Sequence, residues 1–104
     1  DPGYPAYRSS ILMGGGIPYN MPILAKNDYL PVFADIPSDV VAKATAMFLN
    51  YPNNPTGACA TREFFDRTVA FAKTHDIAVM VIPPQIVGTN PGAVFIHILL
   101  TSIR

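Results

Sequence analysis

The fold of this chain is decided by one stretch, Asn50-Tyr51-Pro52-Asn53-Asn54-Pro55-Thr56-Gly57. Three asparagines, two prolines and one glycine within these eight residues favour a tightly shaped turn. An apolar run, Ala46 to Leu49, precedes the turn and is typical of a short buried strand. Because ligands in open α/β sheets bind outside the carboxyl ends of the strands, this turn is a candidate binding loop. A plain surface turn is the alternative.

The residues on either side of the turn predict one βαβ unit. Thr61 to His75 has the spacing of an amphipathic helix, and Thr61 belongs to the residue types that cap helices. The predicted inner face of this helix consists of Phe64, Phe65, Thr68, Val69 and Ala72. Ile77 to Ile82 is a continuous apolar run, the pattern of a strand covered on both faces. We expect it to pair in parallel with Thr45 to Asn50, with the helix packed across both strands. The fold class is therefore α/β.

The first 43 residues predict three further elements. Pro5 to Met13 has the pattern of a short helix, which the triplet Gly14 to Gly16 ends. Ile17 to Ala25 has the composition of a strand, and its two prolines would confine that strand to an edge or a bulge. Asp35 is placed to cap a short helix over Ile36 to Lys43.

The overall composition indicates a folded, soluble chain. It has 104 residues, enough for one domain; half of them are hydrophobic, 13% are charged, and the formal net charge is zero. This balance gives no support for a nucleic-acid partner. The longest apolar runs are far shorter than the roughly 20 residues that span a bilayer, so we expect no membrane segment. The single cysteine, Cys59, excludes an internal disulfide and fits a reducing, cytoplasmic compartment.

Two further features limit the interpretation. Neither His75 nor His97 has a partner at metal-ligand spacing, so no metal site is predicted. The chain begins with Asp1 and not with methionine. Either a leading segment has been removed or the chain is a piece of a longer protein.

The amino-acid sequence of the central stretch resembles that of a known family. Asn54-Pro55-Thr56-Gly57 after an apolar strand is similar to the cofactor loop of the pyridoxal-phosphate aminotransferases of classes I and II. The longer string from Phe48 to Ala58 is most similar to the LL-diaminopimelate aminotransferase branch. Asp1 to Arg8 and Asn27 to Pro31 fit the same branch at the right separations. The resemblance extends over roughly residues 1 to 81.

This resemblance implies both a fold and a function. Residues 1–82 would be a fragment of the large, cofactor-binding domain, a partial three-layer fold with a mostly parallel sheet. Residues 83–104 would be a divergent tail, in which Val94 to Leu100 has the pattern of one more strand. The parent enzyme would use pyridoxal 5′-phosphate to transfer an amino group between an amino acid and a 2-oxo acid, as a homodimer, in amino-acid biosynthesis.

Two cofactor contacts follow from the same resemblance. The side-chain amide of Asn54 would donate a hydrogen bond to the phenolic oxygen of the cofactor, and the ring of Tyr4 would stack on the cofactor ring. The residues alone leave open that Asn54 caps its own turn and that Tyr4 is a core aromatic. The resemblance also favours a cis peptide bond at Asn54–Pro55, with Asp1–Pro2 as a second candidate.

The catalytic apparatus of the family is incomplete in this chain. The family has an acid that pairs with the ring nitrogen of the cofactor where this chain has Ile82, and a tyrosine where it has Gln85. The three lysines all lie upstream of the expected imine lysine; they are Lys26, Lys43 and Lys73. We therefore predict no catalytic residue and no activity for the chain alone. The alternatives are a non-catalytic truncated product and a small anion-binding module.

Overall fold

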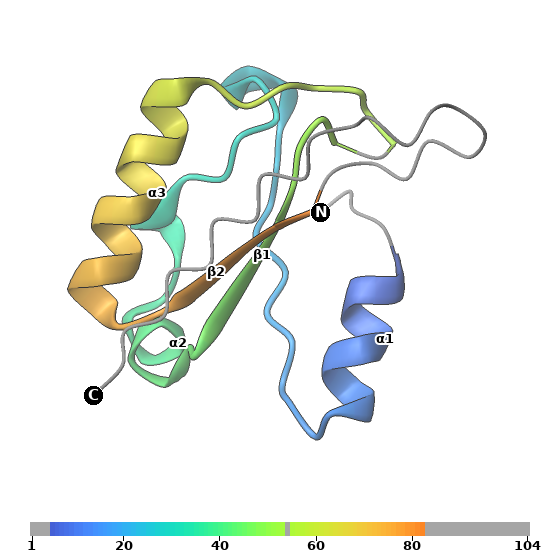
Figure 1. Cartoon of the computed structure of the whole chain (residues 1–104), viewed down its shortest axis with the longest axis vertical. Helices are drawn as coiled ribbons and strands as arrows, with labels where there is room; N and C mark the ends of the chain where they lie inside the picture. Colours follow the sequence, from blue (N-terminus) through green and yellow to red (C-terminus); the bar gives the residue numbers. More distant parts are fainter. Residues whose placement is uncertain (1–4, 54, 83–104) are drawn as a thin grey trace, which may run out of the picture.

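The computed structural model describes residues 5–53 and 55–82. The two strands lie between a long helix on one side and a shorter helix on the other (Figure 1). In chain order the elements are α1 (Pro5–Met13), the 3-10 turns η1 (Ala25–Asn27) and η2 (Phe33–Asp35), α2 (Ser38–Lys43), β1 (Ala46–Asn50), α3 (Arg62–His75) and β2 (Ala78–Ile82).

The predicted βαβ unit is confirmed. Strands β1 and β2 pair in parallel, in a register that runs from Ala46 opposite Ala78 to Asn50 opposite Ile82. Each strand lies within one residue of its predicted range, the ordinary uncertainty of element ends. The core between α3 and the strands consists of Met47, Leu49, Tyr51, Phe64, Ala72, Ile77 and Val79. Three members of the predicted inner face of α3 are buried, and the other two are partly buried.

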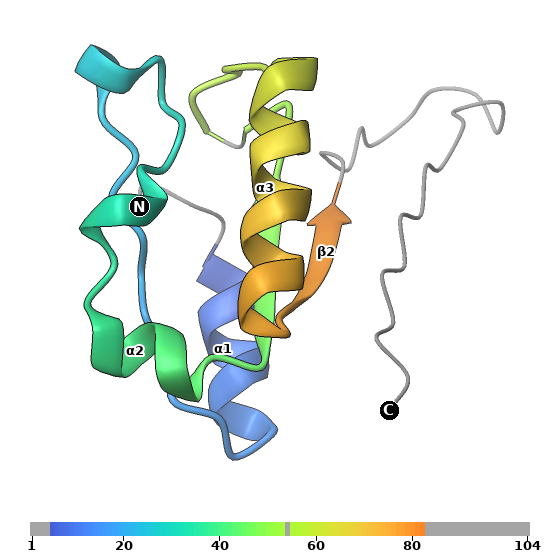
Figure 2. The same ribbon diagram turned by 90° about the vertical axis from the view of Figure 1, so that its left-hand side faces the viewer.

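Helix α1 covers the face of the sheet opposite α3. Side chains alternate along a strand, so Phe48 points away from the face that carries Met47 and Leu49. The ring of Tyr7 on α1 stacks on Phe48, with ring centroids 6.3 Å apart and planes inclined by 17°. Figure 2 shows α3 in front of β1 and α1 behind it. The described residues therefore form helix, sheet and helix layers, consistent with the expected α/β fragment.

The end of α1 and the start of α3 each have an identifiable signal. Helix α1 ends in the glycine triplet as predicted, where the Gly16 N–H donates to the Ile11 carbonyl at 2.9 Å and Gly15 has φ +78°. Helix α3 begins after Thr61, whose hydroxyl oxygen accepts a hydrogen bond from the Phe64 N–H at 3.1 Å. Thr61 is therefore the N-cap that the sequence predicted.

Replacing this cap tests its contribution to stability. We expect Thr61→Ala to lower the free energy of unfolding by about 1 kcal/mol, because the Phe64 N–H loses its side-chain acceptor. The matched control is Thr74→Ala, which removes an exposed hydroxyl that bonds only within α3, to the Ala70 carbonyl. Urea denaturation of both variants measures the difference. Equal stability of the two variants would contradict the role of Thr61.

The predicted strand over Ile17 to Ala25 is wrong. This segment is irregular, pairs with no strand among the described residues, and leads into η1. Pro18 and Pro22 have no N–H to donate to a ladder. Between the segment and β1 lies a cleft, so the segment is held apart from the free edge of β1. Ile17 is 96% exposed, as expected for a residue without a neighbouring strand.

The predicted start of the helix before β1 is also wrong. The helix α2 begins at Ser38, two residues later than expected, and Asp35 ends η2 instead of capping α2. The reason is Pro37, because a proline disfavours the helical conformation in the residue before it. Ile36 accordingly has extended backbone angles, φ −75° and ψ 125°.

Candidate functional site

The loop that follows β1 is a compact turn held by its own hydrogen bonds. The Asn53 N–H donates to the Ala58 carbonyl and the Gly57 N–H donates to the Asn53 carbonyl, both at 2.7 Å. The Asn53 side-chain oxygen Oδ1 accepts from the Thr56 hydroxyl at 2.8 Å. Gly57 has φ +73°, a conformation that favours glycine. Hydrogen bonds among residues 53 and 56–58 therefore hold this part of the loop in one arrangement.

Two side chains attach this loop to the rest of the fold. Asn50, which is 8% exposed, donates from Nδ2 to the Ile82 carbonyl at 2.8 Å and so joins the carboxyl ends of β1 and β2. The Tyr51 hydroxyl donates to the Tyr29 carbonyl at 2.7 Å. Burial raises the pKa of Tyr51 to about 12, because the phenolate would lose its hydration. Among the described residues, every buried side-chain nitrogen or oxygen has a partner.

Sequence reasoning located the loop but missed these supporting side chains. In the sequence, Tyr51 and Asn50 look like ordinary turn residues. Their hydrogen-bond partners lie 22 and 32 residues away, so no local pattern indicates them. Asn53 gave a usable signal, since an asparagine three residues before Thr56 can form a local side-chain turn. The cis peptide bond of the described loop is Tyr51–Pro52. The two predicted cis bonds, Asn54–Pro55 and Asp1–Pro2, lie outside the described residues.

The two predicted cofactor contacts, Tyr4 and Asn54, also lie outside the described residues. The structure describes one chain neighbour of each, Pro5 beside Tyr4 and Asn53 beside Asn54, and both line the same cleft. Pro5, at the start of α1, lines the same cleft as Asn50 and Asn53 of the loop. The cleft has a volume of about 850 Å³, within the range of small-molecule sites. The start of α1 and the loop therefore open onto one space.

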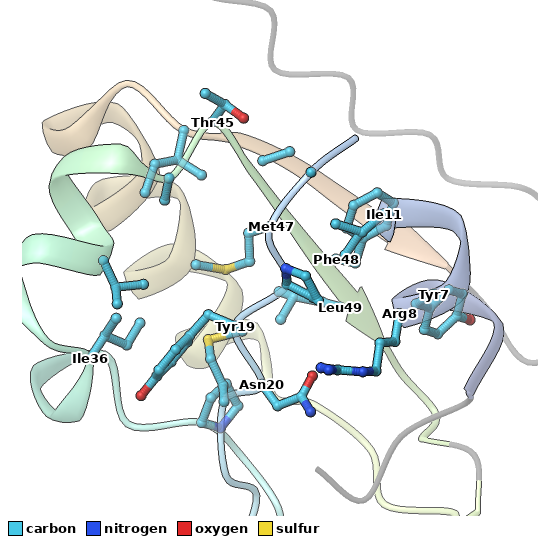
Figure 3. A pocket seen from close by; sticks show the side chains of 18 of the residues that line it. Tyr7, Arg8, Ile11, Tyr19, Asn20, Ile36, Thr45, Met47, Phe48 and Leu49 are labelled. Carbon is cyan, nitrogen blue, oxygen red and sulfur yellow. The ribbon is translucent and has the colours of Figure 1, made fainter. Parts of the chain in front are cut away.

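The cleft runs along the free edge of β1 and combines apolar walls with polar groups. Met47, Phe48 and Leu49 of β1 line it, and Arg8 extends from α1 with its guanidinium pointing toward Asn20 (Figure 3). An arginine and side-chain amides donate hydrogen bonds to anionic or carbonyl oxygens.

The described residues contain no cluster of metal-ligating side chains. None of the helices in these residues is long and apolar enough to cross a membrane.

None of the three lysines lies beside the loop, although Lys43 lines the cleft near the amino end of β1. Lys43 ends α2 and Lys73 lies in the last turn of α3, so both lie near the amino ends of the parallel strands. The loop lies at the opposite, carboxyl ends. Lys26 lies in η1, close to the Tyr29 turn, and all three lysine side chains are exposed. None is buried against the loop, as an imine-forming lysine would need to be.

The end of β2 offers no acid to the site. Ile82 stands opposite Asn50 in the strand register, directly beside the loop, and presents hydrocarbon there. A pyridine nitrogen keeps its proton in a protein when a carboxylate pairs with it. The described residues therefore supply a loop at the end of β1, and the end of β2 carries hydrocarbon where the family resemblance places the acid that pairs with the ring nitrogen.

Comparison with known proteins places these features in a family. The family model described as aminotransferase class I and II matches residues 1–81. The chain is 53% identical over 77 residues to LL-diaminopimelate aminotransferase 2 of Trichormus variabilis, covering 74% of this chain and 20% of that protein. It is 52% identical over 77 residues to transaminase BacF of Bacillus subtilis, covering 74% and 19%.

Solved structures agree with these sequence matches. The apo structure of BacF superposes with a TM-score of 0.75 at 50% identity, over 77% of this chain and 20% of that chain. An aminotransferase from Staphylococcus aureus superposes with a TM-score of 0.73 at 36% identity, over 78% and 21%. The chain thus spans about a fifth of the length of the relatives it matches.

Proposed function

Because this chain belongs to the aminotransferase class I and II family, we propose that it supplies the cofactor loop of an enzyme that transfers an amino group between an amino acid and a 2-oxo acid. Pyridoxal 5′-phosphate is the cofactor of this family. The observation that carries the proposal is the hydrogen-bonded turn at the carboxyl end of β1, between a strand and a capped helix. In open α/β sheets this is where ligands bind.

The proposed roles of the chain's own residues are binding and orientation. Asn54 holds the phenolic oxygen of the cofactor through its side-chain amide, and Tyr4 covers one face of the ring. The support for Asn54 is the fixed position of Asn53, and the support for Tyr4 is that Pro5 opens onto the same cleft as the loop. Pyridoxal phosphate, when bound, supplies the electron sink for amino-group transfer.

The parent enzyme is proposed from the same family membership. Residues 1–82 form part of its large domain, and residues 83–104 form a tail that departs from the family pattern. The relatives include proteins named LL-diaminopimelate aminotransferase, which supports an amino-acid donor and a role in amino-acid biosynthesis. A cytoplasmic homodimer is the proposed form of the parent.

A titration with a non-reactive cofactor analogue tests the loop contact. The suitable probe is the deoxy analogue of pyridoxal phosphate, which keeps the ring, the phenolic oxygen and the phosphate but lacks the aldehyde. Added to the isotope-labelled chain, it should shift the NMR signals of the Asn54 side-chain amide and the Tyr4 ring. The signals of Thr74, exposed near the end of α3, should stay unchanged.

The variant Asn54→Ala should weaken binding of this analogue about ten- to a hundredfold, the factor of one hydrogen bond to a charged oxygen. Asn27→Ala, in η1, is the matched control and should leave binding unchanged. Shifts scattered over the surface, or centred away from Asn54 and Tyr4, would refute the proposed contact.

A further inference from the structure

Tyr51 connects the loop to a distant part of the chain. It is the first residue after β1 and is 8% exposed. Its ring packs edge-on against Phe64 of α3, with centroids 5.7 Å apart, and its hydroxyl donates to the Tyr29 carbonyl at 2.7 Å. The ring therefore belongs to the core, while the hydroxyl reaches a segment 22 residues earlier.

The acceptor of this hydrogen bond lies in an unusual turn. Asp28 and Tyr29 have φ +53° and φ +57°, a left-handed conformation that residues other than glycine seldom adopt. The Tyr29 N–H donates to the Leu24 carbonyl at 3.0 Å, and the Asp28 N–H donates to the Ala25 carbonyl at 3.1 Å. These bonds fix the direction of the Tyr29 carbonyl. Tyr51 thus meets an acceptor that is already held in place.

The position of the loop depends on both of its ends. Downstream of Tyr51, the backbone bonds between Asn53 and residues 57 and 58 hold the loop residues to one another. They set the shape of the loop but connect it to no other segment. Upstream, the Tyr51 hydroxyl connects the loop to the Asp28–Tyr29 turn. Loss of this hydroxyl would leave the loop less firmly placed, so that its internal hydrogen bonds would open to solvent more often.

We propose that Tyr51 is a positioning residue, which fixes the loop carrying Asn54 by its hydrogen bond to the Tyr29 carbonyl. Its relevance to cofactor binding rests on the proposed function, because Asn54 is the group that the loop would present. Tyr51 itself touches no reacting atom in this account. It acts through the loop.

The variant Tyr51→Phe removes the hydroxyl and keeps the ring against Phe64. We expect the Asn53 and Gly57 amides to exchange with solvent about fivefold faster, the factor that corresponds to one net hydrogen bond. The amides of β2 and of the middle of α3 should keep their rates. The matched control is Tyr19→Phe, at a tyrosine that is 43% exposed, which should change neither set.

The exchange pattern decides the proposal. Unchanged loop amides, or an equal acceleration of all amides, would overturn it. Binding of the deoxy cofactor analogue is measured in parallel and judges the proposed function separately. Faster loop exchange with unchanged analogue binding would keep the anchor and refute the cofactor contact at Asn54. Faster exchange with about fivefold weaker binding would support both.

A measurement on the unaltered chain keeps the proposal testable if Tyr51→Phe does not fold. The Tyr51 ring resonance, followed by NMR, should titrate at about pH 12, because its buried hydroxyl keeps the proton. Titration near pH 10.0, the ordinary pKa of tyrosine, would show a hydroxyl in water and contradict the burial in which the Tyr29 carbonyl accepts its hydrogen bond.

Discussion

Replacing Phe64 by alanine should lower the free energy of unfolding of this chain by about 3–5 kcal/mol, a large share of its total stability. Phe64 is 1% exposed and lies at the centre of the core. Its ring contacts Phe33, Tyr51 and Phe65, each with centroids 5.7 Å away. Truncating a buried phenylalanine costs about 3–5 kcal/mol, because the transfer free energy is lost and a cavity remains. A small domain has only about 5–15 kcal/mol of stability in total.

Urea denaturation followed by circular dichroism measures this effect. The control is Ile17→Ala. It also removes a large apolar side chain, but at a position that is 96% exposed. Its expected change is within about 0.5 kcal/mol. If Phe64→Ala and Ile17→Ala had the same midpoint, the core assigned to α3, β1 and β2 would be wrong.

The second large effect is the absence of catalysis. We expect the chain, mixed with pyridoxal phosphate, an amino acid and a 2-oxo acid, to exchange amino groups no faster than pyridoxal phosphate alone. The physical reasons are the exposed positions of all three lysines and the hydrocarbon of Ile82 beside the loop. An imine needs an amine held against the aldehyde, and a protonated ring nitrogen needs a nearby carboxylate.

The assay follows the appearance of the new amino acid, with a full-length relative such as BacF as the positive control. The variant Ile82→Asp provides an internal comparison. It restores an acid at the end of β2 but supplies no lysine, so it too should show no exchange above the free cofactor. Exchange by the unaltered chain above that rate would show that a group assigned here to the surface takes part in the reaction.

Local patterns were sufficient to predict the βαβ unit. The apolar runs of β1 and β2 and the inner face of α3 each follow the period of their own element. Thr61 marks the start of α3 because a cap acts within one turn. These elements needed no information about distant residues.

The errors came from elements that depend on neighbours. Ile17 to Ala25 has strand composition, but a strand forms only with a partner, and this segment faces a cleft. The start of α2 was misplaced because the effect of Pro37 on Ile36 outweighs the capping preference of Asp35. The first outcome depends on the fold, whereas the second follows from a local rule about the residue before a proline.

The candidate site likewise has one feature that local patterns predict and others that depend on distant residues. The place of the loop followed from the strand before it, whereas the partners of Asn50 and Tyr51 depend on the strand register and on the Tyr29 turn. No sequence pattern links residues 22 or 32 positions apart. Tyr4 and Asn54, outside the described residues, remain predictions from family membership.

We propose that this chain presents a cofactor loop without an imine-forming lysine. Borohydride reduction of the chain with pyridoxal phosphate, followed by mass spectrometry of the labelled peptides, tests it most directly. We predict scattered, substoichiometric labelling of Lys26, Lys43 and Lys73, because all three side chains are exposed. Stoichiometric labelling of a single lysine, together with amino-group exchange, would contradict the claim.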